Sequence, residues 1–222
     1  MFKSDVLGAI NLALLTLLAG CAGSASSGSR DLSAVQITEY QGERLSDLGD
    51  FQENSIKGPQ RVDIGSYRLR VTGLVDKPLA YSYSEVLSAH KSYTKLVTLD
   101  CVDGWAVKIL WEGVLVADIT DRAGILPAAN TVIFHAHDGY TTSLPLAYVM
   151  DKNIMLAYKI NGVELPPDRG FPFQLVAEDK WGYKWIKWVT EIELSDDPNY
   201  KGYWERAGYS NDADLDKPFF DR

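Results

Sequence analysis

The sequence predicts a single α+β domain built mainly of antiparallel or mixed β-sheet, with a few short helices. Short runs of alternating apolar and polar residues recur along the chain, and the turn dipeptides Asp138-Gly139 and Asn161-Gly162 each separate two of them. The 222 residues are 46% hydrophobic, which is enough for one sizeable core. No repeat and no internal linker is visible in the sequence that follows residue 37.

The individual elements follow from local patterns. Alternation predicts a strand over residues 67–75, which the turn residues 76–78 end. Ser82 and Glu85 have the spacing of a capping box and predict a short helix over 83–89. The same patterns predict the remaining elements: strands over 93–101, 105–111, 131–134, 140–144, 154–160, 163–165, 173–177 and 187–194, and short helices over 118–123 and 146–151.

The N-terminal residues are expected to direct export rather than to fold. Residues 1–20 have the features of a signal peptide, because Lys3 precedes an apolar run that is too short to span a bilayer. The run ends in Leu18-Ala19-Gly20-Cys21, which resembles the lipobox of bacterial lipoproteins, and such a site would leave Cys21 lipidated at the mature N-terminus. Residues 21–36, rich in Gly and Ser at their start, would be a flexible tether before a domain over 37–222. An ordinary secretory signal with an incidental cysteine is the alternative.

The formal net charge of -8 argues against two classes of partner. No basic cluster is present that would bind nucleic acid, and anionic lipid headgroups would repel the domain.

Cys101 is the strongest candidate for a functional residue in the sequence. It stands between two expected strands and is followed by an Asp103-Gly104 turn, so its thiol can be presented into a cleft. A thiolate is a strong ligand for soft metals and a good nucleophile. If Cys21 carries lipid, Cys101 has no partner for an internal disulfide. A buried structural cysteine is the simpler interpretation of the same residue.

Two other chemistries involving Cys101 remain open at this stage. A zinc site would need clustered ligands, and the sequence offers His90, His135 and His137 beside the thiol. A cysteine hydrolase would need His135 or His137 close to Cys101, yet no nucleophile-elbow pattern surrounds the cysteine. No phosphate-binding P-loop or Gly-x-Gly-x-x-Gly sequence indicates nucleotide binding.

Residues 180–187 form a second unusual stretch, in which three lysines alternate with aromatic residues in an acidic chain. Gly182 permits close approach of the backbone, so this loop could hold a phosphate and stack on a planar ring. Packing of the lysines at the edge of a sheet is the alternative.

Taken together, these stretches resemble the oxidoreductase molybdopterin-binding domain of the sulfite oxidase-like superfamily. Its small bacterial members include the catalytic subunit of the periplasmic methionine-sulfoxide reductase. The resemblance runs from about residue 39 to at least residue 214. It depends on the order and spacing of several motifs: residues 67–78, Leu99-Asp100-Cys101 with Trp105 and residues 111–113, residues 138–145, residues 161–167, Gly170-Phe171-Pro172 and residues 180–187.

The resemblance implies the sulfite oxidase-type molybdopterin-binding fold and Mo-molybdopterin as cofactor. In that family one cysteine is the sole protein ligand to molybdenum, and Cys101 fits that position. A soft thiolate suits a metal whose other ligands are largely sulfur. The role of Cys101 would be both catalytic and metal-binding.

The resemblance also implies a set of cofactor-binding residues. The lysine-rich loop binds the pterin phosphate in the family, which maps onto Lys180, Gly182, Lys184 and Lys187, and Trp185 and Ile186 would offer backbone amides. The other positions that match cofactor contacts are Asn54, Lys57 and Arg169.

Three features depart from the family pattern. Gln174 stands where an arginine is expected, and Ala136 stands at the position of a contacting threonine. The N-terminal residues contain no arginine pair for the twin-arginine export of a cofactor-loaded protein.

We therefore expect a molybdopterin-dependent oxidoreductase that performs oxygen-atom or two-electron transfer, on a small molecule or a methionine sulfoxide. Asp100, Asp103 and Glu112 near the cysteine argue against a dianionic substrate such as sulfite. Electrons would come from a membrane haem or quinone-linked protein, and the enzyme would be lipid-anchored on the periplasmic or extracytoplasmic side of the cell envelope. The alternative is a cofactor-free envelope lipoprotein that uses the fold as a binding module.

Overall fold

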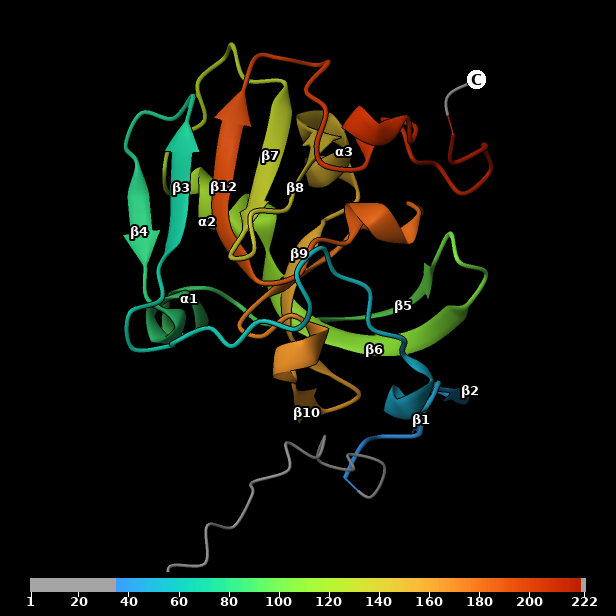
Figure 1. Cartoon of the computed structure of the whole chain (residues 1–222). Helices are drawn as coiled ribbons and strands as arrows, with labels where there is room; N and C mark the ends of the chain where they lie inside the picture. The colour runs from blue at the N-terminus through green and yellow to red at the C-terminus, as the bar shows by residue number, and fades with distance from the viewer. Residues whose placement is uncertain (1–34, 221–222) are drawn as a thin grey trace, which may run out of the picture. The chain divides into compact units, whose positions relative to one another are not determined.

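The computed structural model describes residues 35–220, whose strands form two five-stranded sheets and one small hairpin (Figure 1). The expected signal peptide and Cys21, and all but the last two residues of the tether, lie outside the described residues. In order along the chain, the strands are β1 Glu39–Tyr40, β2 Glu43–Arg44, β3 Leu69–Gly73, β4 Leu79–Tyr81, β5 Tyr93–Asp100, β6 Ala106–Leu115, β7 Thr131–Ala136, β8 Thr141–Pro145, β9 Met155–Ile160, β10 Val163–Glu164, β11 Gln174–Val176 and β12 Val189–Ser195.

One sheet has the order β4-β3-β12-β7-β8. Strand β12 lies at its centre, parallel to β3 and antiparallel to β7. Strands β7 and β8 form the hairpin expected around Asp138-Gly139, and Gly139 adopts a φ of 89°. Burial of alternate residues on β12, including Ile192 and Leu194, fixes its register in the sheet.

The other sheet has the order β10-β9-β6-β5, and β11 also pairs with β9. Strands β5 and β6 pair along their whole length from Tyr93–Gly113 to Asp100–Ala106, and Cys101 lies in the connection between them. Strands β9 and β10 form the hairpin predicted from Asn161-Gly162, which have φ values of 45° and 79°. Both values are positive, as a type I′ turn requires.

Short helices cover the ends of the sheets. Helix α1 is Tyr83–Ala89, and its capping box is present as expected, with Glu85 accepting from the Ser82 backbone at 2.7 Å. Helix α3 is Leu146–Asp151, as predicted. Helix α2 is Val116–Asp121 and begins two residues earlier than expected, because it follows β6 directly without a side-chain cap.

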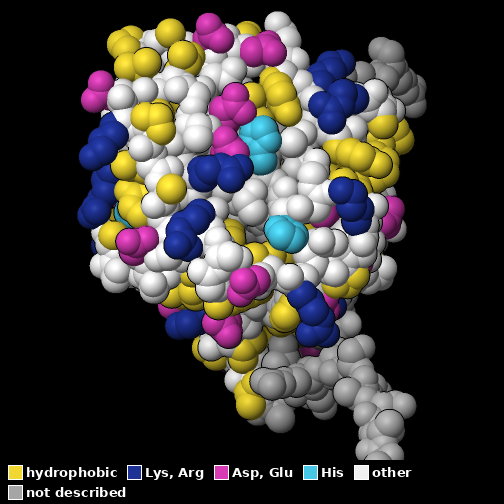
Figure 2. Space-filling view, turned by 60° about the vertical axis from the view of Figure 1, so that its left-hand side comes forward, with side chains coloured by type: hydrophobic (Ala, Val, Ile, Leu, Met, Phe, Trp, Pro, Cys, Tyr) yellow, Lys and Arg dark blue, Asp and Glu magenta, His cyan; other side chains and the backbone are white. Residues whose placement is uncertain are grey.

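The predicted α+β class and the single domain over the described residues are confirmed. Several small elements were not expected, namely β1, β2, β4 and the 3-10 turns Leu48–Asp50, Pro167–Arg169, Gly182–Lys184 and Glu205–Ala207. Residues 196–220 form a C-terminal strap, named here for its course over β8 and the loop 180–187. Among the described residues, no helix is long and apolar enough to cross a membrane. Acidic and basic side chains are interspersed on the face shown in Figure 2.

Candidate functional site

The Cys101 thiol is held in a tight turn at the end of β5. The Cys101 backbone N–H donates to the Trp105 carbonyl at 2.9 Å, and Gly104 donates back to the Cys101 carbonyl at 3.0 Å. Gly104 has a φ of 87°, which favours glycine and completes the turn. The side chain of Cys101 is 9% exposed, so it is enclosed but reaches the surface of a cavity.

Asn54 and Asp103 surround the sulfur atom. The Asn54 Nδ2 donates to Cys101 Sγ at 3.6 Å and to an Asp103 carboxylate oxygen at 2.6 Å. Burial raises the pKa of the Cys101 thiol above its ordinary value, while the hydrogen bonds from the Asp103 backbone and from Asn54 act in the opposite direction. The structure therefore brings together Cys101 and Asn54, two residues that the sequence singled out 47 positions apart.

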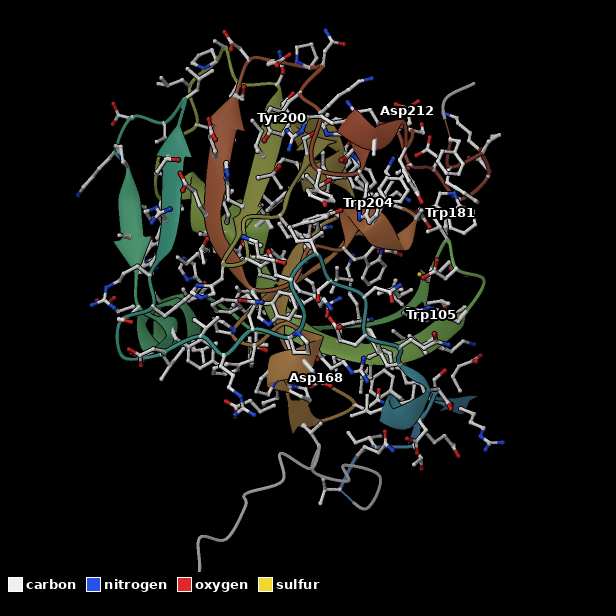
Figure 3. All side chains as sticks on the ribbon, in the orientation of Figure 1. Trp105, Asp168, Trp181, Tyr200, Trp204 and Asp212 are labelled. Carbon is white, nitrogen blue, oxygen red and sulfur yellow. The ribbon has the colours of Figure 1, made fainter. Side chains whose placement is uncertain are left out.

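A cavity of about 430 Å³ extends from Cys101 to the loop 180–187. Residues 51–56 and the turn that begins at Cys101 form part of its wall, and residues 182–183 and 185–188 form another part. Trp105 and Trp204 reach it from different parts of the fold, the start of β6 and the C-terminal strap (Figure 3). A volume of this size lies in the range of roughly 300–1,000 Å³ typical of sites for small molecules and cofactors.

The wall of the cavity carries polar atoms that are buried yet have no hydrogen-bond partner among the described residues. These atoms are Ser55 Oγ, Trp105 Nε1 and Gln174 Oε1. Buried polar groups in folded proteins are nearly always paired, and leaving one unpaired costs about 1–3 kcal/mol. The cavity is therefore suited to a ligand that offers both donors and acceptors.

Cationic side chains lie in the wall of the cavity and beside it. Lys187 lines it and forms an ion pair with Glu53 at 2.7 Å. Arg169 lies over the Phe51 ring at 4.9 Å, and its Nη1 is buried with no partner within the described part of the chain. Burial lowers the pKa of Arg169, although Asp168 and Glu53 act in the opposite direction. Lys57 is exposed, and its Nζ lies close to Gly139 at the β7–β8 turn.

The structure does not bring the other two lysines of the loop to the cavity. The Lys184 ammonium is completely buried and forms an ion pair with Glu205 at 2.6 Å. Lys180 pairs with Asp214 and donates to the Asp212 carbonyl. The expectation that both ammonium groups face a phosphate is not met in this arrangement, because carboxylates of the C-terminal strap already neutralise them.

Trp185 and Ile186 line the cavity, but their backbone amides are engaged within the loop. Trp185 N–H donates to the Gly182 carbonyl and Ile186 N–H to the Lys184 carbonyl, both at 3.0 Å. The turn over Gly182–Lys184 accounts for these bonds, so the expected free amides at these two positions are not observed. Gly182 packs against Cys101, because a β-carbon there would lie 3.3 Å from the Cys101 Cα.

The two departures from the family pattern lie in different surroundings. Gln174 is buried at 1% exposure and lines the cavity. Ala136 ends β7, and its N–H donates to the Tyr140 carbonyl. The arginine missing at position 174 thus leaves a neutral amide in the wall, while Arg169 supplies a buried guanidinium close to Phe51, another wall residue.

None of the three histidines lines this cavity, so neither the cysteine hydrolase nor a zinc site that includes Cys101 is supported. His90 Nδ1 lies 3.0 Å from the Val86 carbonyl, which can only accept a hydrogen bond from it, and His137 is exposed. Within residues 35–220, the one grouping suited to a metal ion is His135, Glu191 and Glu193 on β7 and β12.

Several cavity residues were not identified from the sequence. Glu53, Tyr140, Trp204 and Tyr209 all line it. Glu53 is 134 positions from its partner Lys187 in the sequence, so no local pattern could have indicated the pair. The spacing of the aromatic residues in the strap gives no indication that they reach β8 or the cavity.

Comparison with known proteins identifies relatives over most of the described chain. Residues 56–204 match the family model of the oxidoreductase molybdopterin binding domain. The chain is 38% identical over 152 residues to the uncharacterized oxidoreductase YuiH of Bacillus subtilis, covering 68% of this chain and 76% of that one. It is 32% identical to the putative protein-methionine-sulfoxide reductase subunit YedZ1 of Azospira oryzae, covering 68% of this chain and 57% of that one.

More distant similarities agree with these. The chain is 31% identical to the NADPH nitrate reductase of Aspergillus niger over 64% of its own length, but it spans only 19% of that protein. Among solved structures, the sulfane dehydrogenase SoxCD from Paracoccus pantotrophus matches with a TM-score of 0.62 and 25% identity, covering 65% of this chain and 42% of that one. The expected sulfite oxidase-like fold is thereby confirmed.

Proposed function

This chain belongs to the oxidoreductase molybdopterin-binding domain family and is a molybdenum cofactor-dependent enzyme, and on that premise we propose that the cavity beside Cys101 holds the cofactor. Cys101 would be the protein's ligand to molybdenum. When bound, the cofactor supplies oxygen-atom and two-electron transfer chemistry, and the protein supplies binding, orientation and electrostatics. The observation that carries the proposal is the continuity of one cavity from the Cys101 thiol to Lys187.

The residues present fit a molybdopterin. Its pterin ring carries several hydrogen-bond donors and acceptors, which suit the unpaired atoms of Ser55, Trp105 and Gln174. Its phosphate suits Lys187 in the cavity wall, and Arg169 and the more exposed Lys57 would help to hold it. The soft thiolate of Cys101 suits molybdenum.

Asn54 would have a positioning role at the metal. Its amide donates to the sulfur and to Asp103 at the same time, so it fixes both groups relative to one another. A hydrogen bond to sulfur stabilises the thiolate, the form that binds metals. Cys101 is largely buried but lines the cavity, so a cofactor bound there can reach its thiol.

A neutral substrate, such as a sulfoxide, fits the charges of the cavity better than an anion. Its wall carries the carboxylates of Glu53, Asp103 and Asp138, while Lys187 is its one lysine among the described residues and is paired with Glu53. An anionic substrate close to the thiol would be repelled by the Asp103 carboxylate, which bonds to Asn54 beside the sulfur. Aromatic side chains such as Trp204 would contact the apolar part of a neutral sulfur compound. One relative carries the name of a putative protein-methionine-sulfoxide reductase subunit, which agrees with this choice.

We further propose that the enzyme is anchored by lipid on Cys21 at the periplasmic or extracytoplasmic face of the envelope. Support comes from the lipobox-like sequence ending in Cys21. Its electron donor would be a membrane haem or quinone-linked protein, since the anchor would hold the domain beside the membrane. Loss of membrane association in Cys21→Ser would support the anchor, and unchanged membrane association would contradict it.

The substrate proposal is tested with purified, cofactor-loaded protein. Reduction of a neutral sulfoxide and of nitrate by a reduced viologen dye is measured beside oxidation of sulfite. We expect kcat/KM for the sulfoxide to exceed the values for both anions. Higher kcat/KM for sulfite or nitrate would contradict the assignment, and a chain purified from cofactor-competent cells without molybdenum would instead favour the cofactor-free binding module.

A further inference from the structure

The C-terminal strap (residues 196–220) is fastened to the core by a set of specific contacts. Tyr203 N–H donates to the Thr141 carbonyl at 2.9 Å, and Ser143 Oγ donates to the Tyr200 carbonyl at 3.0 Å. A β-carbon at Gly202 would lie 2.2 Å from the Thr141 carbonyl oxygen, so the strap lies directly on β8. Figure 3 shows Tyr200, Trp204 and Asp212 along this course.

At the centre of these contacts is the buried ion pair between Lys184 and Glu205, both of which are completely shielded from solvent at the side chain. Lys184 Nζ donates to Glu205 at 2.6 Å, to the Ser143 carbonyl at 3.0 Å and to Asn211 Oδ1 at 3.2 Å. Thr142 Oγ1 donates to the same oxygen of Glu205 at 2.7 Å. The pair therefore joins the loop 180–187, β8 and the strap.

The same strap places two aromatic rings in the cavity wall. Trp204 and Tyr209 line the cavity, and their ring centroids lie 5.2 Å apart. Tyr209 also contacts Tyr183 of the loop, with centroids 5.1 Å apart. Glu205 is the residue next to Trp204, so the position of the ion pair fixes where this ring stands.

We infer that Lys184 and Glu205 are positioning residues, whose buried ion pair holds the strap so that Trp204 and Tyr209 form the outer wall of the cavity. Lys184 reaches three partners that are all away from the cavity. If its ammonium bound the cofactor phosphate instead, Glu205 would be left as a buried carboxylate without a counter-ion, which is strongly unfavourable. The phosphate is then held by other cations, Lys187 and Arg169.

The inference depends on the proposed function only for the identity of what the cavity holds. Order in the strap can be measured on the chain without cofactor. Failure of the cofactor assignment and failure of this inference are therefore distinguishable.

The first test compares Glu205→Gln and Lys184→Met by amide hydrogen exchange of the cofactor-free chain. Both variants are expected to accelerate exchange in residues 198–213 by about tenfold or more, because loss of either partner leaves the other buried and unpaired. Peptides from β5 and β6 should keep their protection, which shows that the fold is intact. Arg206→Gln is the matched control, because Arg206 lies in the same 3-10 turn and its side chain bonds only to the exposed Lys201 carbonyl among the contacts described.

The double variant Lys184→Met/Glu205→Gln keeps the test decisive if a single variant folds poorly. If the two residues act as an ion pair, the effects of the two substitutions are coupled. Amide exchange in the strap should then be no faster in the double variant than in the single variant with the faster exchange. Independent, additive effects would overturn the inference.

The second test separates a strap-positioning lysine from a phosphate-binding one. Both single variants should retain molybdenum after cofactor loading, and both should raise KM more than they lower kcat, because the altered wall contacts the substrate. Loss of cofactor in Lys184→Met alone, with a protected strap in Glu205→Gln, would overturn the inference and make Lys184 a direct ligand of the phosphate.

Discussion

Replacing Lys187 by glutamine is expected to weaken cofactor binding roughly tenfold to a hundredfold. Lys187 lines the cavity that also contains the Cys101 thiol, and its side chain is 13% exposed. Burial lowers the pKa of Lys187, while its hydrogen bond with Glu53 raises it. The side chain can therefore offer a partly desolvated positive charge to a phosphate.

The magnitude follows from the contact that is lost. A hydrogen bond to a charged group contributes about 1.5–3 kcal/mol, and about 1.4 kcal/mol corresponds to a tenfold change in Kd. Glu53 competes with the phosphate for the same ammonium, at 2.7 Å. Glu53→Gln should consequently change Kd in the opposite direction and tighten binding.

The assay titrates the cofactor-free protein with isolated molybdopterin and follows tryptophan fluorescence, since Trp105 and Trp185 line the cavity. Lys152→Gln is the control, because Lys152 forms an ion pair of 2.6 Å with Asp179 but does not line the cavity. The dependence of Kd on salt should also become weaker in Lys187→Gln only.

One confounding effect is the unpaired Glu53 left by Lys187→Gln. The double variant Glu53→Gln/Lys187→Gln removes it and should still bind the cofactor more weakly than the wild type, because the Lys187 ammonium is absent. If both Lys187 variants bind the cofactor with wild-type affinity and wild-type salt dependence, the assignment of Lys187 to the phosphate is refuted.

Three further predictions concern the thiol and the fold. Because burial raises the pKa of Cys101, alkylation of the cofactor-free chain should reach half its maximal rate above pH 9.0. Asn54→Ala should move this midpoint to a higher pH, because the variant loses a hydrogen bond to the sulfur. A midpoint at a lower pH than in the wild type would contradict the role of that bond. Ser82→Ala should lower the free energy of unfolding by about 1 kcal/mol in urea denaturation through loss of the helix cap, and an unchanged value would show that the capping box is not formed. Gly113→Ala should lower the free energy of unfolding by about 1–3 kcal/mol, since the new β-carbon would lie 2.2 Å from a β9 carbonyl oxygen. Gly65→Ala is the control and should lower it less, because the nearest atom to its β-carbon would lie at 3.4 Å.

Much of the fold could be predicted because its signals are local. Asn161 and Gly162 adopt the two positive φ angles that their hairpin requires, and both residue types favour this turn. Ser82 and Glu85 cap α1 within one helical turn. Predictions that depend on neighbouring residues alone were therefore the most accurate.

The elements that were missed depend on distant partners or on very short pairings. Strand β4 exists because it pairs with β3 across the turn at 76–78, which the sequence indicated only as an end. The hairpin of β1 and β2 has two residues in each strand and turns at Gln41 and Gly42, both with positive φ. A non-glycine residue such as Gln41 in this conformation gives no clear signal in the sequence.

In the candidate site, too, features with local signals could be predicted and features that depend on distant partners could not. Cys101 was identified correctly as the residue that faces a cleft, because a turn follows its strand immediately. The partner of Lys184 could not be foreseen, since Glu205 reaches it only through the course of the C-terminal strap. A lysine-rich sequence thus indicated positive charge, but the fold decided which ammonium group is available to a ligand.

The proposed function depends most directly on the bond from Cys101 to molybdenum. X-ray absorption at the molybdenum edge should be measured on wild type and on Cys101→Ser, both purified from cofactor-competent cells, together with the metal content. We predict about one molybdenum per chain in the wild type, and one fewer sulfur neighbour or loss of the metal in Cys101→Ser. Wild-type protein without molybdenum, or an unchanged set of sulfur neighbours in the variant, would contradict the account.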